Sequence, residues 1–444
     1  MNTWDNRKLF RLLWPLVVEQ ILAVTMGAAD TIMVSSAGEA AVSAVNVIDN
    51  INNFFIIAFT ALCTGGAVVV SQYIGRGDAV NARGASRQLY YTVILAAVLV
   101  MVPAMIWRRP IIRFLYGGLE AEVMNPASLY FLITAASYPF LGIYNACAAL
   151  FRASGNSRVP MRIALLVNCT NIGGNSLFIF GLGLGAGGAA VATLCSRIIA
   201  AAVMTLMLVR GRTLPIGLGN LAGFSINRVM AARILKVGIP SGLESSLFQA
   251  GRLLTQRIFT GFGTAAMAGN AIASVINSFS YMPGMAFGMG LLTVVGQCIG
   301  AGDYGGARKY TARIMKMTYG VLLVISVSIF IGTEGLLDLF GLSAGARQYA
   351  RAFLRVHCIS MALSWSMSFA LPNALRAAGD ARFVMTVAAF SMFTVRVSAA
   401  YLITYVFNAG PLGVWLAMGL DFIIRGSLYL WRWLGGKWQE KRVI

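Results

Sequence analysis

The sequence predicts an all-α integral membrane protein whose twelve transmembrane helices form two parallel six-helix repeats. Three observations predict this class: of the 444 residues 58% are hydrophobic, only 11% are charged, and several motifs of the first half recur in the second. Soluble domains carry about 25% charged residues. The composition therefore excludes an ordinary soluble protein.

Twelve stretches of the chain are long and apolar enough to cross a bilayer, which takes about 20 apolar residues in a helix. In order they are approximately 9–34, 45–73, 88–107, 127–150, 159–181, 188–209, 233–259, 268–298, 313–332, 349–376, 383–406 and 413–434. The first stretch is too long for the apolar region of a signal peptide and lacks its small-residue cleavage site. We therefore expect it to be a membrane span.

One motif occurs where the second span ends and again where the eighth ends. The segment "IGRGDAVNAR" (74–83) aligns at a shift of 225 with "IGAGDYGGAR" (299–308). Its glycines allow the chain to turn after a helix, and Asp78 and Asp303 can cap a short helix that follows or pair with the next arginine. The motif predicts a repeated helix–turn–helix corner.

The same shift relates residues elsewhere in the chain, including Glu19 with Glu244. A shift of 224 aligns "ALFRASGNSR" (149–158) with "NALRAAGDAR" (373–382). Because each repeat holds an even number of spans, the two repeats keep one orientation. We expect an N-terminal lobe (1–209), a cytoplasmic linker (210–232) and a C-terminal lobe (233–444).

The basic residues gather in alternate loops, which explains the net charge of +20 without a nucleic-acid partner. By the positive-inside rule, both termini lie in the cytoplasm and the chain crosses the cell's inner (plasma) membrane many times. The six cysteines lie singly inside expected helices, with no metal-like spacing, and are interpreted as reduced packing residues. No nucleotide-binding or catalytic constellation is present, so we expect neither an enzyme nor a cofactor.

Several motifs together resemble one transporter family. They are "WPLVVEQ...MGAADTIM" in the first span, "GG-x5-Q-x2-G-x-G-D" at the end of the second, "NIGGNSLFIFG" in the fifth and "ALRAAGD" after the tenth. In this order and spacing the chain resembles the multidrug and toxic compound extrusion (MATE) transporters. The resemblance implies a V-shaped, monomeric pair of lobes that exports small organic compounds in exchange for H⁺ or Na⁺. The alternative is a flippase for lipid-linked precursors from the wider superfamily.

Charged residues inside a membrane are costly and usually functional. Asp30 and Glu19 lie eleven residues apart on one face of the first span, about 16 Å along its axis. The resemblance assigns cation coupling to Asp30, with Asn171 and Asn175 as its polar partners. Asp30 is otherwise a structural carboxylate, and Glu19 is either a second coupling residue or an interfacial charge.

Further polar and flexible side chains inside the spans predict a substrate cavity. They are Asn46, Asp49, Asn50, Asn53 and Asn168 in the first half, and Glu244, Arg252, Asn270, Asn277, Met285, Met289, Arg396, Asp421 and Arg425 in the second. The methionines are either packing residues or part of an adaptable pocket. The cluster of Arg396, Asp421 and Arg425, with Glu244, is either a salt-bridge network or a site for an anionic or zwitterionic substrate.

The second half departs from the sodium-coupled branch of the family. That branch has acids on the seventh and tenth spans, where this chain has Phe248 and Trp365. Sodium needs several oxygen ligands, whereas a proton needs one carboxylate. We therefore expect H⁺ as the coupling ion, with Na⁺ at Asp30 as the alternative and no other metal.

Overall fold

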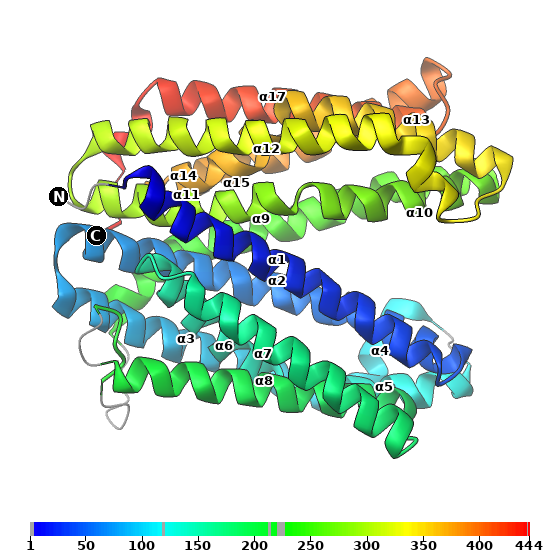
Figure 1. Ribbon diagram of the computed structural model, residues 1–444, viewed down its shortest axis with the longest axis horizontal. Helices are drawn as coiled ribbons and strands as arrows, with labels where there is room; N and C mark the ends of the chain where they lie inside the picture. Colours follow the sequence, from blue (N-terminus) through cyan, green and yellow to red (C-terminus); the bar gives the residue numbers. More distant parts are fainter. Residues whose placement is uncertain (1–3, 118–119, 212–214, 220–226, 442) are drawn as a thin grey trace. The chain divides into compact units, whose positions relative to one another are not determined.

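The computed structural model describes residues 4–117, 120–211, 215–219, 227–441 and 443–444 (Figure 1). Throughout these residues the regular structure is helical and contains no strand. This is the predicted fold class. Residues 212–214 and 220–226 of the predicted linker lie outside the described residues.

Each of the twelve expected spans corresponds to one helix or to a run of helices. In the first half they are α1 (Asn6–Ser35), α2 (Glu39–Arg76), α3 (Ala79–Ile106), α5 with α6 (Ala121–Ala136, Tyr138–Ala153), α7 with η1 (Arg158–Asn175, Ser176–Gly181) and α8 (Gly185–Arg210). In the second half they are α9 (Arg228–Thr260), α10 with α11 (Gly263–Ser280, Met282–Gly300), α12 (Tyr304–Asp338), α13 with η2 and α14 (Ala344–Ser360, Met361–Ala370, Leu371–Ala377), α15 with η3, α16 and η4 (Ala381–Phe390, Ser391–Val397, Ser398–Tyr401, Leu402–Val406) and α17 (Leu412–Leu434). Two short helices, α4 (Arg108–Tyr116) and η5 (Lys437–Glu440), were not expected.

Most of these helices are apolar enough to span a membrane by themselves. Among the described residues nine pass on length and hydropathy, and the pair α5–α6, bent by 44°, brings the number to ten. The two expected spans that do not pass are α9 and the run α13–α14. Both carry several charged residues: α9 contains Glu244 and five basic residues, and α13 contains three arginines. Their charges need partners inside the protein.

The chain divides into two compact units. The first unit comprises residues 10–242, and the second comprises residues 243–444 with the described part of residues 1–9. The division falls inside α9, whose beginning packs on α2 so closely that a Cβ at Gly65 would collide with the carbonyl oxygen of Ile234. The lobe boundary at residues 232 and 233 remains a prediction; the division between the compact units lies ten residues further on.

The backbone repeats along with the sequence. Gly77 and Gly302 end their helices with positive φ angles of 79° and 75°. Asn408, the one described non-glycine residue with a positive φ (53°), aligns at the same shift of 225 with Gly183, whose φ is 66°. Left-handed backbone at matching positions indicates that the two units repeat one chain path.

The predicted helix caps are confirmed, with one correction. Asp78 accepts a hydrogen bond from the backbone N of Asn81 (3.0 Å), and Asp303 accepts one from that of Gly306 (2.7 Å). The helices they cap are not short, since α3 has 28 residues and α12 has 35. The first turns of α3 and α12 are polar, so the apolar pattern that marks the expected spans begins later in the sequence than the helices do.

Close helix contacts organise each unit (Figure 1). In the first unit α2 packs against α3, α5 and α6, and α7 packs along α8. In the second, α10 packs on α13, α11 on α12 and α14, and α17 on η2 and η3. A Cβ at Gly284 on α11 would collide with the Trp365 ring, and one at Gly288 would lie 2.6 Å from Nδ2 of Asn373. The spacing Gly284-x-x-x-Gly288 therefore permits close approach of α11 to the neighbouring helices.

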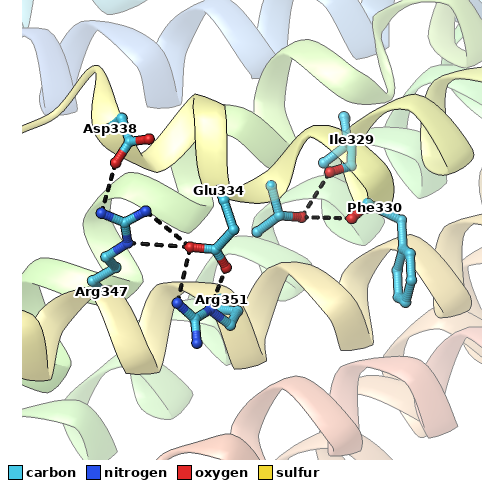
Figure 2. Close-up of polar contacts among 7 residues, drawn as sticks. Ile329, Phe330, Glu334, Asp338, Arg347 and Arg351 are labelled. Carbon is cyan, nitrogen blue, oxygen red and sulfur yellow. Dashed lines mark hydrogen bonds and ion pairs between the residues drawn. The ribbon is translucent and has the colours of Figure 1, made fainter.

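Paired charges join the end of α12 to the start of α13 (Figure 2). Arg347 contacts both Asp338 (2.6 Å) and Glu334 (2.9 Å). Arg351 also donates to Glu334, at 2.9 Å. Two arginines of a sparsely basic loop are therefore matched by two carboxylates. Each such exposed pair contributes little stability by itself, about 0–1 kcal/mol.

Candidate functional site

A polar network surrounds Asp30 near the end of α1. Asn175 donates its Nδ2 to Asp30 Oδ1 at 2.5 Å and to Asn171 Oδ1 at 3.3 Å. Asn171 in turn donates to Thr193 Oγ1 on α8 at 3.3 Å. Both asparagines are fully buried because α7 packs against α8. The structure thus brings together the three residues proposed for cation coupling, whose role stays a prediction.

A second carboxylate, Asp49 on α2, lies in the same region. It accepts hydrogen bonds from the Tyr130 hydroxyl (3.1 Å) and from Asn52 Nδ2 (3.4 Å), and Asn52 accepts one from Tyr138 (2.8 Å). Asp30 and Asp49 interact electrostatically with one another. Asp49 is therefore held directly by the Tyr130 hydroxyl and, through Asn52, by that of Tyr138, two buried tyrosines that the sequence interpretation did not select.

The remaining predicted polar residues of the first unit do not contact Asp30. The side chains of Asn46, Asn50 and Asn53 are exposed along α2. Asn50 donates to the carbonyl oxygen of Asn46 (3.0 Å), and the buried Asn168 donates to that of Ala164 (2.9 Å). The amides of Asn50 and Asn168 thus bond backbone groups of their own helices.

The sequence interpretation missed Arg197 in the middle of α8. Its Nη1 donates to Ser137 Oγ at 2.6 Å, and its charge interacts with both Asp30 and Asp49. Two carboxylates facing one guanidinium make this interior net negative. Its position as the one arginine inside the predicted span 188–209 could have identified it, because charged residues within membrane spans are usually functional.

The structure pairs each glutamate of the repeat with an arginine. Arg152 Nη1 lies 2.6 Å from Glu19 Oε1, and Arg376 Nη2 lies 2.7 Å from both carboxylate oxygens of Glu244. Glu19 is paired with Arg152, and whether it takes part in coupling or is an interfacial charge stays a prediction. Arg152 lies beyond the expected span 127–150, but α6 continues to Ala153 and places Arg152 in its last helical turn.

In the second unit, Arg396, Asp421 and Arg425 do form the expected cluster. Arg425 Nη2 lies 3.3 Å and Arg396 Nη1 4.0 Å from Asp421 Oδ2, and Ser391 donates to Oδ1. All three charged residues are buried. Glu244, which the sequence also associates with this cluster, pairs with Arg376 instead of with Arg396 or Arg425.

Aromatic rings surround the two guanidinium groups. Arg425 lies over Phe369, 4.4 Å from the ring centroid, and over Phe248, at 5.3 Å. Arg396 lies 5.5 Å from the Phe248 centroid. Trp365 stacks on Phe369 at 5.0 Å. Phe248 and Trp365 stand where the resemblance places acids in the sodium-coupled branch. Phe248 thus lies beside both arginines of the cluster, and Trp365 stacks on Phe369.

The other predicted cavity residues of the second unit lie apart from this cluster or at its edge. Asn270 is buried and accepts a hydrogen bond from Trp415 Nε1 (3.2 Å). Asn277 and Met289 are half-buried, whereas Met285 is exposed. Arg252 is exposed on α9 and interacts electrostatically with Arg396. Only Arg252 extends the cluster.

Neither metal chemistry nor disulfides distinguish the site. Across the described residues no group of three histidine, cysteine or acidic side chains is placed to hold a metal ion, and all six cysteines are free. His357 is buried and hydrogen-bonded through Nε2 to Ser280 Oγ (2.9 Å). The chemistry available is that of carboxylates, amides and guanidinium groups.

Comparison with known proteins places the chain in a family. The MatE family model matches residues 15–177 and 240–402. The chain is 27% identical to the uncharacterized transporter YisQ of Bacillus subtilis (98% of this chain, 95% of the relative). It is 26% identical to a probable multidrug resistance protein NorM of Thermotoga maritima (99% of this chain, 94% of the relative).

Solved structures show the same fold. A crystal structure of MATE in the bent conformation matches with a TM-score of 0.91 at 19% identity, covering 98% of this chain and 96% of that one. A MOP superfamily transporter from Pyrococcus furiosus, described as having a binding pocket of reverse polarity, matches with a TM-score of 0.91 at 20% identity (98% and 97%). Because the two family matches repeat at the shift found in the sequence and together span more than half of it, the chain belongs to the MATE family of multi-pass membrane secondary transporters.

Proposed function

We propose that this chain exports small organic compounds across the plasma membrane in exchange for protons, with Asp30 as the proton-binding carboxylate. The observation that carries the proposal is the 2.5 Å contact between Asp30 and the buried amide of Asn175. A carboxylate inside a membrane span is costly, and one held by a buried amide is suited to a functional role. The related probable multidrug resistance proteins support the substrate class.

The chemistry around Asp30 favours a proton over sodium. Hard cations bind several oxygen ligands, whereas Asn175 presents its N–H group, not its oxygen, to the carboxylate of Asp30. Protonation of Asp30 removes the charge that this N–H stabilises and weakens its link to α7. Pro15 breaks the hydrogen-bond ladder of α1 near its other end. Loss of the Asp30 charge would therefore let α1 repack, and deprotonation would reverse the change.

Both termini are proposed to lie in the cytoplasm. Basic residues are concentrated in the loops on one predicted side, whereas Arg347 and Arg351 on the other side are offset by Glu334 and Asp338. The positive-inside rule then orients the chain. We also propose that the transporter works as a monomer, since Asp30, Asn171 and Asn175 meet within one unit of the chain.

Transport by purified protein in proteoliposomes tests the coupling. Cationic ethidium and anionic 1-naphthoate serve as probes, under either a pH gradient or a Na⁺ gradient at equal pH. We expect the pH gradient to drive export by the wild type and by Glu39→Gln, which removes an exposed acid at the start of α2. Asp30→Asn should reduce export to background.

Two results would contradict the proposal. Transport driven by the Na⁺ gradient and indifferent to pH would assign coupling to sodium. If neither probe is exported under either gradient, the proposal that the chain exports drug-like compounds is wrong. A flippase of lipid-linked precursors is then the alternative.

A further inference from the structure

The arginine cluster of the second unit carries more positive charge than its single carboxylate can balance. Arg396 and Arg425 are buried to more than nine-tenths of their side chains, and Asp421 is completely buried. Arg252 adds a third positive charge within electrostatic range of Arg396. Burying an unbalanced charge is costly, so a cluster of this kind needs a compensating anion.

The hydrogen bonds of the cluster are also incomplete. Arg396 Nε and Arg425 Nε and Nη2 are buried without a hydrogen-bond partner among the described residues, as is Asp421 Oδ2. Although Arg425 Nη2 lies 3.3 Å from that oxygen, the pair is not aligned for a hydrogen bond. Buried polar groups are normally paired, and unpaired ones call for an explanation.

The neighbouring ion pair shows what a structural salt bridge looks like in the same unit. Arg376 meets both oxygens of Glu244 at 2.7 Å and donates to Asn373 at 2.8 Å. It leaves one guanidinium nitrogen unpaired, whereas Arg396 and Arg425 together leave three. The cluster is therefore poorly explained as a salt bridge that serves only stability.

Its backbone is also irregular. Arg396 and Ser391 both lie on η3, a π-helical turn inside the eleventh span. Such turns are uncommon and recur at functional sites. The shift that aligns the two repeats changes from 224 to 225 between residues 382 and 408, the interval that contains η3 and η4.

The rings beside the guanidinium groups indicate the shape of a ligand. Phe248 and Phe369 are only half-buried, and Arg425 lies over both of them. Guanidinium N–H groups bind carboxylates, and flat aromatic bodies pack on such rings. We propose that Arg396 and Arg425, with Phe248 and Phe369, form a subsite that binds the oxyanion group of a small aromatic anionic or zwitterionic substrate. The assignment rests on the proposed export function, for which it names a substrate class.

Binding of 1-naphthoate to the purified full-length transporter in detergent, measured by titration calorimetry, tests this subsite. The neutral isostere 1-naphthamide reports the aromatic contribution alone. We expect wild-type protein to bind the carboxylate at least 10-fold more tightly than the amide. Arg396→Gln should weaken naphthoate binding by about 10-fold to 100-fold, the range for hydrogen bonds to charged groups, while Arg396→Lys loses less. Arg355→Gln, which changes an exposed arginine over Phe330, is the matched control and should leave binding unchanged.

If Arg396→Gln fails to fold, the comparison of naphthoate with naphthamide on the wild type still decides the test, and a second variant adds to it. Asp421→Asn removes the competing internal carboxylate, so naphthoate should bind more tightly and raise its thermal unfolding midpoint more than that of the wild type. Equal binding of naphthoate and naphthamide by the wild type, or no gain in Asp421→Asn, would show a structural cluster and overturn the proposal.

Competition with phospholipid separates a transported anion from a lipid headgroup. Displacement of naphthoate by phosphatidylglycerol but not by phosphatidylcholine would assign the subsite to lipid and overturn the substrate assignment; indifference to both supports it. Because binding is measured without a gradient, failure of proton coupling at Asp30 would leave these outcomes unaffected.

Discussion

The two units repeat one chain path, yet their interiors carry opposite net charge. Each unit has a matched Glu–Arg pair. Besides this pair, the interior of the first unit contains Asp30 and Asp49 with Arg197. The interior of the second contains Asp421 with Arg396 and Arg425. When the halves are aligned at a shift of 225, none of these six charged residues falls on another charged residue. The pairs are Asp30 with Thr255, Asp49 with Ser274, Arg197 with Phe422, Asn171 with Arg396, Ser196 with Asp421, and Ala200 with Arg425.

This difference separates what the repeat needs to fold from what each unit adds. Elements common to both units, such as the Glu–Arg pairs and the aspartate caps, satisfy backbone or side-chain groups that the helix path creates. The interior clusters around Asp30 and Asp421, each present in only one unit, leave charge incompletely balanced. We infer that the shared pairs are structural and that these two clusters are functional.

The largest expected effect is the difference between removing the charge of Asp30, in the net negative interior, and removing that of Asp421, in the net positive one. Asp30→Asn should reduce proton-driven export to background while leaving thermal stability close to wild type, because Asn175 can still donate to the new amide oxygen. Asp421→Asn should instead lower the free energy of unfolding by about 3–5 kcal/mol, since two buried arginines lose their only carboxylate in the cluster. Export and thermal unfolding of both variants give the comparison; the same phenotype for both would break it.

The shared ion pairs should behave alike. Glu19→Gln and Glu244→Gln each leave a partly buried arginine unbalanced, at a cost of up to about 3 kcal/mol, the lower end of the range for buried pairs. The second cost should be the larger, because Arg376 contacts both oxygens of Glu244. Adding Arg152→Gln or Arg376→Gln should recover part of the loss, and double-mutant cycles on thermal unfolding measure the coupling. Additive single effects would show that neither pair acts as a unit.

Gly188 and Gly413, which align at the shift of 225, test the close packing of the chain after the fifth and eleventh spans. A Cβ at Gly188 would lie 2.9 Å from backbone atoms of Phe178, and one at Gly413 would lie 2.5 Å from Thr404 Oγ1. Gly188→Ala and Gly413→Ala should each destabilise by about 1–3 kcal/mol, the second more. Gly320→Ala, at a helical position with no atom within 4 Å, is the control and should stabilise by about 0.5–1 kcal/mol. Equal effects at all three sites would refute the packing argument.

The smallest expected effect concerns the caps. Asp303→Ala should cost about 1 kcal/mol of stability. The pKa of Asp78 is lowered from its ordinary 3.8, chiefly by the hydrogen bond from the Asn81 side chain and then by that from its backbone N–H. Its stabilising effect is therefore complete above pH 3.8 and is lost as the pH falls below that value. Thermal unfolding of Asp78→Ala should differ from wild type at pH 7 and converge with it in acid; a constant difference would contradict the cap.

Much of the fold follows from composition and repetition alone. Apolar stretches of span length predict helices because a bilayer leaves no other partner for backbone groups, and twelve were found in the expected places. Their ends were less predictable, since α2, α3 and α12 extend beyond their apolar portions into polar turns that only the cap geometry identifies. The contact between Asp30 and Asn175 was anticipated because family resemblance related two positions far apart in the sequence.

The amino-acid sequence by itself determined the twelve spans, the repeat and most of the charged residues that lie within those spans. Only the tertiary structure decided which of those charges meet. Glu19 lies on the same helix face as Asp30 but pairs with Arg152, and Arg197 enters the Asp30 region from α8. The physical reason is that side-chain spacing along one helix specifies a face, whereas the partner on that face depends on how other helices pack against it.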